Sequence, residues 1–220
     1  MLAAILYDLD GTIVNTDPLH YQAWQELLRD YRLEIDEEFY KTRMSGRLNP
    51  DIVQDLLPEF SLEAVQHFSD RKEARFRELA TELTPLPGLC NLIAWASTRG
   101  LKQAVVTNAP RQNADYMLKV LKLQQNFAQV VVSEEIGIPK PDPTPYLYIL
   151  NEFGLSPEQA LAFEDSPSGI RAAVGAGIPT VGIASTQEPR DLYNLGAMLV
   201  IPDFTDSQLW SLLGSPNPNR

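Results

Sequence analysis

Six short and nearly all-apolar runs recur along the chain, and they constrain its fold more than any other feature. Apolar runs that stop at polar or turn residues are typical of strands buried on both faces, as the strands of a parallel sheet are. The second run also carries two polar residues, Lys102 and Gln103. We therefore expect strands over residues 2–7, 101–106, 128–132, 160–163, 178–183 and 197–201.

Segments with helical periodicity separate these runs. Apolar residues recur at the three- and four-residue spacing of one helix face over residues 87–100, 114–121, 146–153 and 166–177. The last segment starts with a serine–proline pair, which is typical of an N-cap followed by a first-turn proline. Strands and helices in alternation, joined by right-handed crossovers, predict an α/β fold with a doubly wound, Rossmann-like parallel sheet.

A long stretch after the first strand breaks this alternation. Leu19, Ala23 and Trp24 begin a helical spacing there, and no strand pattern appears for nearly seventy residues. Further helical segments, rich in charge, cover residues 37–44, 50–57 and 62–83. We therefore expect a small helical bundle over residues 16–85, inserted into an α/β core made of residues 1–15 and 86–220, with hinges at 15–18 and 84–88.

Polar side chains follow four of the predicted strands at their carboxyl ends, where ligands bind to open α/β sheets. In strand order they are Asp8 with Asp10, Thr107 with Asn108, Lys140, and Glu164 with Asp165. Several carboxylates in one crevice need a compensating charge, and Mg²⁺ prefers such oxygen ligands. Lys140 and Thr107 add donors for an anion. A metal, anion donors and paired carboxylates predict a phosphoryl-transfer site.

Each motif also has a simpler interpretation when it is taken alone. Asp8-Leu9-Asp10-Gly11-Thr12 could be a polar turn after a strand, and Lys140-Pro141-Asp142-Pro143 a rigid solvent loop. Thr107-Asn108 and Glu164-Asp165-Ser166 could cap the helices that follow them. The order of the four motifs, each at a strand end, favours one shared site.

In this order the four motifs resemble those of the haloacid-dehalogenase-like hydrolase superfamily, and the resemblance spans nearly the whole chain. The helical insert resembles the branch with a four-helix cap domain, to which β-phosphoglucomutase and many small phosphatases belong. His20, Ala23 and Trp24, together with Ser45-Gly46-Arg47, resemble β-phosphoglucomutase-like members in particular. The resemblance thus implies a catalytic core and a cap over residues 16–85.

The resemblance implies a role for each matched residue of the core. Asp8 would be the nucleophile that forms an aspartyl-phosphate, and Asp10 would be the general acid and base. Thr107 would bind a phosphoryl oxygen, and Lys140 would neutralise the phosphoryl group and Asp8.

The same resemblance implies a metal site and further substrate contacts. Asp8, Asp10 through its backbone carbonyl, Glu164 and Asp165 would hold Mg²⁺. Gly11, Thr12 and Asn108 would add substrate contacts in the core, and Gly11 would also permit the turn that brings the two aspartates together.

In the cap, the candidate substrate contacts are His20, Arg47 and Lys72. Lys72 lies four residues from both Phe68 and Phe76, so it shares their helix face, and it matches a cap lysine of the phosphoglucomutase pattern. Two alternatives stay open. Lys72 lies in a run of charged residues, which is typical of a solvated face, and His20 could be a packed or capping histidine.

Two departures from the mutase pattern favour hydrolysis. The mutase pattern has an arginine where this chain has Asn49, and a serine form of the motif that reads Thr107-Asn108-Ala109 here. We therefore predict a Mg²⁺-dependent phosphatase for a small phosphomonoester such as a sugar phosphate or phosphoglycolate. A β-phosphoglucomutase-type phosphate transfer and a non-catalytic phosphometabolite-binding protein are the alternatives.

Charge and cysteine content disfavour other classes. The chain carries 18 Lys+Arg against 29 Asp+Glu, a formal charge of −11 that repels nucleic acid. Its one cysteine, Cys90, cannot form an intramolecular disulfide, and we expect it in the core. No apolar run approaches the roughly 18 residues of a membrane span, and the first residues lack the basic region of a signal peptide. We expect a cytoplasmic monomer whose partner is a small phosphorylated metabolite.

Overall fold

The computed structural model describes residues 1–215 and 217–218. The chain divides into two compact units. The core unit comprises Met1–Asn15 and Leu83–Arg220, and the helical unit comprises Thr16–Glu82.

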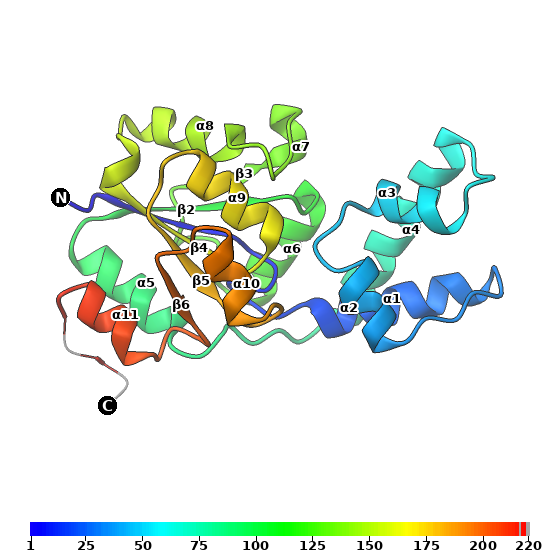
Figure 1. The fold of residues 1–220 in the computed structure, drawn as a ribbon, viewed down its shortest axis with the longest axis horizontal. Helices are drawn as coiled ribbons and strands as arrows, with labels where there is room; N and C mark the ends of the chain where they lie inside the picture. Colours follow the sequence, from blue (N-terminus) through cyan, green and yellow to red (C-terminus); the bar gives the residue numbers. More distant parts are fainter. Residues whose placement is uncertain (216, 219–220) are drawn as a thin grey trace. The chain divides into compact units, whose positions relative to one another are not determined.

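The core unit is built on a parallel sheet with the strand order β3-β2-β1-β4-β5-β6 (Figure 1). The strands are β1 (Ala4–Tyr7), β2 (Lys102–Thr107), β3 (Gln129–Val132), β4 (Ala160–Glu164), β5 (Thr180–Ile183) and β6 (Leu199–Ile201). The prediction of a doubly wound, Rossmann-like parallel sheet is confirmed. Three strands begin two residues later than predicted, and for β5 the reason is Pro179, which has no N–H to donate to a neighbouring strand.

β1 is the central strand, because it pairs with β2 on one side and with β4 on the other. The side chains of one sheet face pack against α8 (Thr144–Phe153) and α9 (Pro167–Gly175), and α5 (Leu89–Thr98) and α11 (Ser207–Leu212) cover the other face (Figure 1). The three layers bury all of β1. The remaining helices are α6 (Arg111–Val120), α7 (Ser133–Ile136), α10 (Pro189–Asn194) and a 3₁₀ turn at Pro157–Gln159.

Helix α5 begins two residues later than predicted, because Gly88 precedes it in the left-handed conformation, at φ 79°. A Cβ at Gly88 would lie 2.6 Å from the backbone carbon of Phe204, so this close approach also requires glycine. The expectation that Cys90 lies in the core is wrong, because its side chain is exposed. The core-facing side of α5 is formed by Leu89, Leu92, Ile93 and Ala96 instead.

The helical unit contains α1 (Asp17–Arg29), α2 (Glu37–Arg43), α3 (Asn49–Leu56) and α4 (Leu62–Leu79). Helix α4 ends four residues earlier than the sequence pattern indicates, with Ala80 as its C-cap. The helices enclose their own apolar core, which includes Trp24, Leu28, Tyr40, Ile52, Val65 and Phe68. Among the described residues, no helix is long and apolar enough to span a bilayer.

Candidate active site

The candidate site lies where the direction of the strand order changes. From β1 the chain builds the sheet outward through β2 and β3, and then returns to the other side of β1 with β4. The carboxyl ends of β1 and β4 therefore lie at the switch point, where open α/β sheets bind ligands. Asp8 directly follows β1, Glu164 ends β4, and Asp165 comes next.

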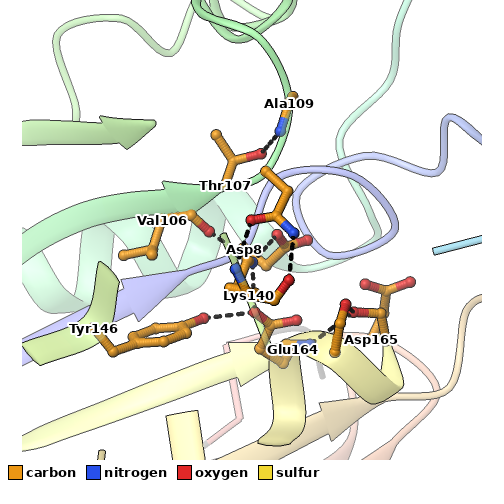
Figure 2. A network of polar contacts seen from close by, with 12 residues as sticks. Asp8, Val106, Thr107, Ala109, Lys140, Tyr146, Glu164 and Asp165 are labelled. Atoms are coloured by element: carbon orange, nitrogen blue, oxygen red, sulfur yellow. Dashed lines mark hydrogen bonds and ion pairs between the residues drawn. The ribbon is translucent and has the colours of Figure 1, made fainter. Parts of the chain in front are cut away.

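The ammonium group of Lys140 joins three strand ends at this switch point. Its Nζ donates to Oδ1 of Asp8 at 2.6 Å, to Oε1 of Glu164 at 2.7 Å and to the backbone carbonyl of Val106 at 2.9 Å (Figure 2). Lys140 is only 4% exposed. The solvent-loop interpretation of this motif is therefore wrong, because its lysine is buried between carboxylates.

Glu164 is fully buried and receives a second charge-assisted bond. The hydroxyl of Tyr146 donates to Oε1 of Glu164 at 2.6 Å, so this oxygen accepts from both Lys140 and Tyr146 (Figure 2). The other oxygen, Oε2, is buried and has no hydrogen-bond partner among the described residues. A buried carboxylate oxygen without a donor is costly, which points to a cation that the side chains do not supply.

A divalent cation fits the donor set. One carboxylate oxygen each from Asp8, Glu164 and Asp165 lie within 4.8 Å of one another, and all three residues are buried. Three carboxylates and the single ammonium of Lys140 leave a formal charge of −2 when all are ionised, which one divalent ion would balance. Hard oxygen ligands of this kind suit Mg²⁺.

Burial and neighbouring charges shift the pKa values of the central pair. Burial raises the pKa of Asp8 to about 7, with Lys140 opposing this shift and Glu164 adding to it. For Lys140, burial disfavours the charged form, but the carboxylates of Asp8 and Glu164 outweigh burial and raise its pKa. Lys140 is therefore a cation at neutral pH.

The turn after Asp8 needs its glycine. Gly11 has φ 80°, its N–H donates to the carbonyl of Val14 at 2.8 Å, and a Cβ there would overlap the carboxylate of Asp165. Asp10 is partly buried in this turn and lies close enough to Asp8 to raise the pKa of that carboxyl. Thr12 is buried, and its hydroxyl has no partner among the described residues.

Thr107 and Asn108 lie at the carboxyl end of β2, beside Lys140. Thr107 is buried, and its hydroxyl accepts from the N–H of Ala109 at 2.9 Å (Figure 2). The side-chain amide of Asn108 bonds to the backbone of Lys140. Neither residue is the N-cap of α6, which is Pro110, so the capping interpretation is wrong for this motif. At the fourth motif, Ser166 does cap α9, by accepting from the N–H of Gly169.

Two residues of the site, Ser185 and Thr186, were not predicted from the sequence. The hydroxyl of Ser185 donates to the carbonyl of Gly11, and the hydroxyl of Thr186 donates to Oδ2 of Asp165. Both follow the end of β5. The sequence did contain a signal for them, because Ser185 and Thr186 follow the end of a predicted strand, as the residues of the four motifs do.

In the helical unit, two of the three predicted contact residues lie together. Nζ of Lys72 is 2.7 Å from Nδ1 of His20 and 2.8 Å from Oε1 of Glu73, and the His20 ring stacks on Phe76 at 4.1 Å. Asn49 donates to the same oxygen of Glu73. Lys72 is 3% exposed, so the solvated-face interpretation is wrong.

Arg47 does not join this cluster. Its guanidinium pairs with Asp55 at 2.7 Å and donates to the carbonyl of Arg43 at 2.9 Å, on the surface of the helical unit. Glu73 was missed by the sequence analysis because adjacent helix residues do not normally face a common partner, so no spacing rule links Glu73 to Lys72.

The core residues predicted from the four motifs therefore converge. A buried carboxylate held by a lysine, beside two further carboxylates that could hold a metal ion, at the switch point of a doubly wound sheet, is typical of α/β enzymes of the phosphoryl-transfer class. Residues 5–183 match the family model described as haloacid dehalogenase-like hydrolase, and the chain belongs to this family.

Similar proteins support this membership. The chain is 27% identical to the phosphorylated carbohydrates phosphatase of Thermotoga maritima, over 91% of this chain and 94% of that protein. It is 31% identical to the fructose-1-phosphate phosphatase YqaB of Escherichia coli, over 82% and 96%. The crystal structure of a CbbY variant from Rhodobacter sphaeroides with xylulose 1,5-bisphosphate superposes with a TM-score of 0.82 at 26% identity, over 93% and 95%. The prediction of a phosphoric monoester enzyme of this family is confirmed.

Proposed function

We propose that this protein is a Mg²⁺-dependent phosphatase that hydrolyses a small phosphorylated carbohydrate or a similar phosphomonoester through an aspartyl-phosphate. The observation that carries the proposal is the buried contact of Lys140 with both Asp8 and Glu164 at the switch point. A lysine held between two carboxylates keeps a nucleophile and a metal ligand side by side, and it lets a phosphate anion approach them.

The proposed reaction has two displacements. A carboxylate oxygen of Asp8 attacks phosphorus while the bond to the leaving oxygen breaks, and Asp10 gives that oxygen a proton. A water molecule then attacks the phosphorus of the aspartyl-phosphate, and Asp10 takes its proton. The bond between phosphorus and the Asp8 oxygen breaks as the water oxygen bonds to phosphorus, inorganic phosphate leaves, and both aspartates return to their starting states.

The other core residues bind and orient the phosphoryl group. Lys140 would neutralise its charge, and the Thr107 hydroxyl would donate to one of its oxygens, with Gly11 and Thr12 lining the turn beside it. Asp8, Asp10 through its carbonyl, Glu164 and Asp165 would hold Mg²⁺, which when bound supplies charge neutralisation for the phosphoryl group.

The substrate class rests on the relatives and on the helical unit. Two similar proteins are named as phosphatases of carbohydrate phosphates. We propose the helical unit over residues 16–85 as the cap, with His20 and Lys72 as its substrate contacts. Arg47 would have to leave its ion pair with Asp55 to take part. The cytoplasmic location and the monomeric state stay predictions.

Hydrolysis of p-nitrophenyl phosphate with and without EDTA tests the proposal. We expect turnover that needs Mg²⁺, is abolished by chelation and returns when Mg²⁺ is added in excess. Asp8→Asn should lose at least about 10³-fold in kcat/KM, because the nucleophile is gone. Asp115→Asn makes the same change at an exposed acid of α6 and should stay near wild type. Turnover that survives EDTA, or that persists in Asp8→Asn, would contradict the proposal.

A β-phosphoglucomutase-type transfer is the second candidate, motivated by the cap lysine Lys72. Its ammonium already faces Glu73, so the cluster offers little net positive charge to a second phosphate. Phosphorus NMR on β-glucose 1-phosphate with a bisphosphate primer separates the two activities. We expect free phosphate, whereas glucose 6-phosphate would support the mutase. Tight binding of a phosphometabolite without turnover, across a broad panel, would support a non-catalytic protein.

A further inference from the structure

The side chain of Asn108 forms a reciprocal pair with the backbone of Lys140. Its Oδ1 accepts from the Lys140 N–H at 3.0 Å, and its Nδ2 donates to the Lys140 carbonyl at 3.0 Å. This arrangement fixes the orientation of the amide group, because only the oxygen can accept and only the nitrogen can donate. Asn108 was expected to contact substrate, yet its side chain bonds the catalytic loop.

The loop that carries Lys140 has few backbone donors with which to form hydrogen bonds of its own. Prolines stand at positions 139, 141 and 143, and none has an N–H to donate. Within the described residues, no other backbone group bonds the N–H or the carbonyl of Lys140. Both of these backbone groups therefore depend on Asn108, which lies 32 positions earlier in the sequence.

The end of β2 thus holds Lys140 at two places. Asn108 fixes its backbone, and the carbonyl of Val106 accepts from its Nζ at 2.9 Å. A lysine side chain is long and flexible, so the place of its ammonium depends on where its backbone is anchored. The ammonium must meet Asp8 and Glu164 together, which leaves little tolerance for displacement.

We propose that Asn108 is a positioning residue, which sets the place of the Lys140 ammonium by anchoring its backbone. The expected loss of kcat rests on the proposed phosphatase activity. The anchoring of the Lys140 backbone by Asn108 does not depend on that activity. An anchoring role and a substrate-contact role make different predictions, because the first acts through Lys140 and the second does not.

The kinetic test uses Asn108→Ala and Asn108→Asp in the full chain, with p-nitrophenyl phosphate and Mg²⁺. Both variants should lose about 10-fold to 100-fold in kcat, with KM changed by less than about threefold, since a small misplacement of a catalytic group costs about that much. Asn108→Asp keeps an acceptor for the Lys140 N–H but faces its carbonyl with a second acceptor. The control, Asn126→Ala, removes an exposed asparagine and should stay near wild type. A rise in KM at unchanged kcat would overturn the proposal.

Backbone hydrogen exchange, followed by NMR, tests the anchor without any turnover. The Lys140 amide should exchange at least about 10-fold faster in Asn108→Ala than in wild type, while the Val105 amide in β2 keeps its wild-type rate and shows that the fold is intact. An unchanged Lys140 rate would overturn the proposal. A wild-type protein without phosphatase activity would contradict the proposed function instead, and the exchange comparison would still decide on the anchor.

Discussion

Two buried lysines, Lys140 and Lys72, differ in how many carboxylates compensate their charge. Burying an ammonium is costly unless carboxylates compensate it. Lys140 meets two carboxylates, those of Asp8 and Glu164, whereas Lys72 meets one carboxylate, that of Glu73, and the ring nitrogen of His20. The first cluster therefore keeps an excess of negative charge that suits a cation, and the second is balanced. The core unit therefore holds the cluster of carboxylates that could bind a metal ion.

Tyr146→Phe should destabilise the protein by about 2 kcal/mol, because it removes a buried hydrogen bond to the charged Glu164. Tyr148→Phe is the matched control, since Tyr148 lies two positions further along α8 and is exposed. Urea unfolding of the two variants measures the difference. Equal stability of the two variants would show that the Tyr146 hydroxyl contributes nothing to the fold.

Glu73 makes the stability of the helical unit depend on pH in the acid range. Burial raises the pKa of Glu73, but Lys72, His20 and the bond from Asn49 outweigh burial and lower it to about 2. A lowered pKa stabilises the folded state above the ordinary value of 4.5, and this contribution is lost as pH falls toward 2.

Wild type should therefore lose roughly 3 kcal/mol more than Glu73→Gln as the pH falls from about 5 to about 2, at about 1.4 kcal/mol per unit of pKa shift. Urea unfolding at a series of pH values measures the two slopes. Glu63→Gln changes an exposed acid of the same helix and should keep the wild-type slope. Parallel wild-type and Glu73→Gln slopes would contradict the role of Glu73.

At the scale of elements, the short junction between β4 and α9 carries two carboxylates of the site, Glu164 and Asp165. β4 ends at Glu164, Asp165 follows, and Ser166 caps α9 by accepting from the N–H of Gly169 at 3.0 Å. A Cβ at Gly169 would overlap the Glu164 carboxylate, so the first turn of α9 lies directly against this side chain. The helix start therefore fixes where Glu164 lies.

Gly169→Ala should displace Glu164, costing about 1–3 kcal/mol of stability through overpacking and lowering the affinity for Mg²⁺. Gly175→Ala is the matched control in the same helix, where a Cβ would only touch Pro143 at 3.6 Å, and it should be neutral or slightly stabilising. Thermal unfolding and Mg²⁺ titration measure both effects. Wild-type Mg²⁺ affinity in Gly169→Ala would refute this close packing.

At the scale of the whole molecule, sheet topology assembles the site. Asp8 and Glu164 stand far apart in the sequence, yet they meet because β1 pairs with β4 in parallel register. Lys140 enters from a loop beyond β3 and joins both. A cation bound there would tie together segments from most of the core unit, so its binding should stabilise the folded state as a whole.

Mg²⁺ at about 100 times its Kd should therefore add about 2.7 kcal/mol to the free energy of unfolding, a rise of roughly 5–10 °C in Tm for a chain of this size. Differential scanning calorimetry with Mg²⁺ and with EDTA measures the rise. Asp165→Asn should reduce it strongly, and Asp115→Asn should leave it unchanged. If the Tm is the same with Mg²⁺ and with EDTA, the folded chain does not bind Mg²⁺ and the metal has no part in the proposed function.

The sequence alone determined the strands, the four helices after β1 and the motif residues at the carboxyl ends of the strands. It could do so because burial on both faces produces apolar runs, and helix faces produce three- and four-residue spacing. Parallel strands also place their carboxyl ends at one edge of the sheet, so the order of the motifs already predicted that Asp8, Lys140, Glu164 and Asp165 converge.

The tertiary structure decided which side chains meet across elements. It turned Asn108 toward the backbone of Lys140, brought Thr186 to Asp165, paired Arg47 with Asp55 and exposed Cys90. Sequence spacing determines only which residues share a face within one helix or strand. The direction of a side chain toward a distant partner depends on how the layers pack and on where buried charge must be compensated, and these are properties of the folded chain.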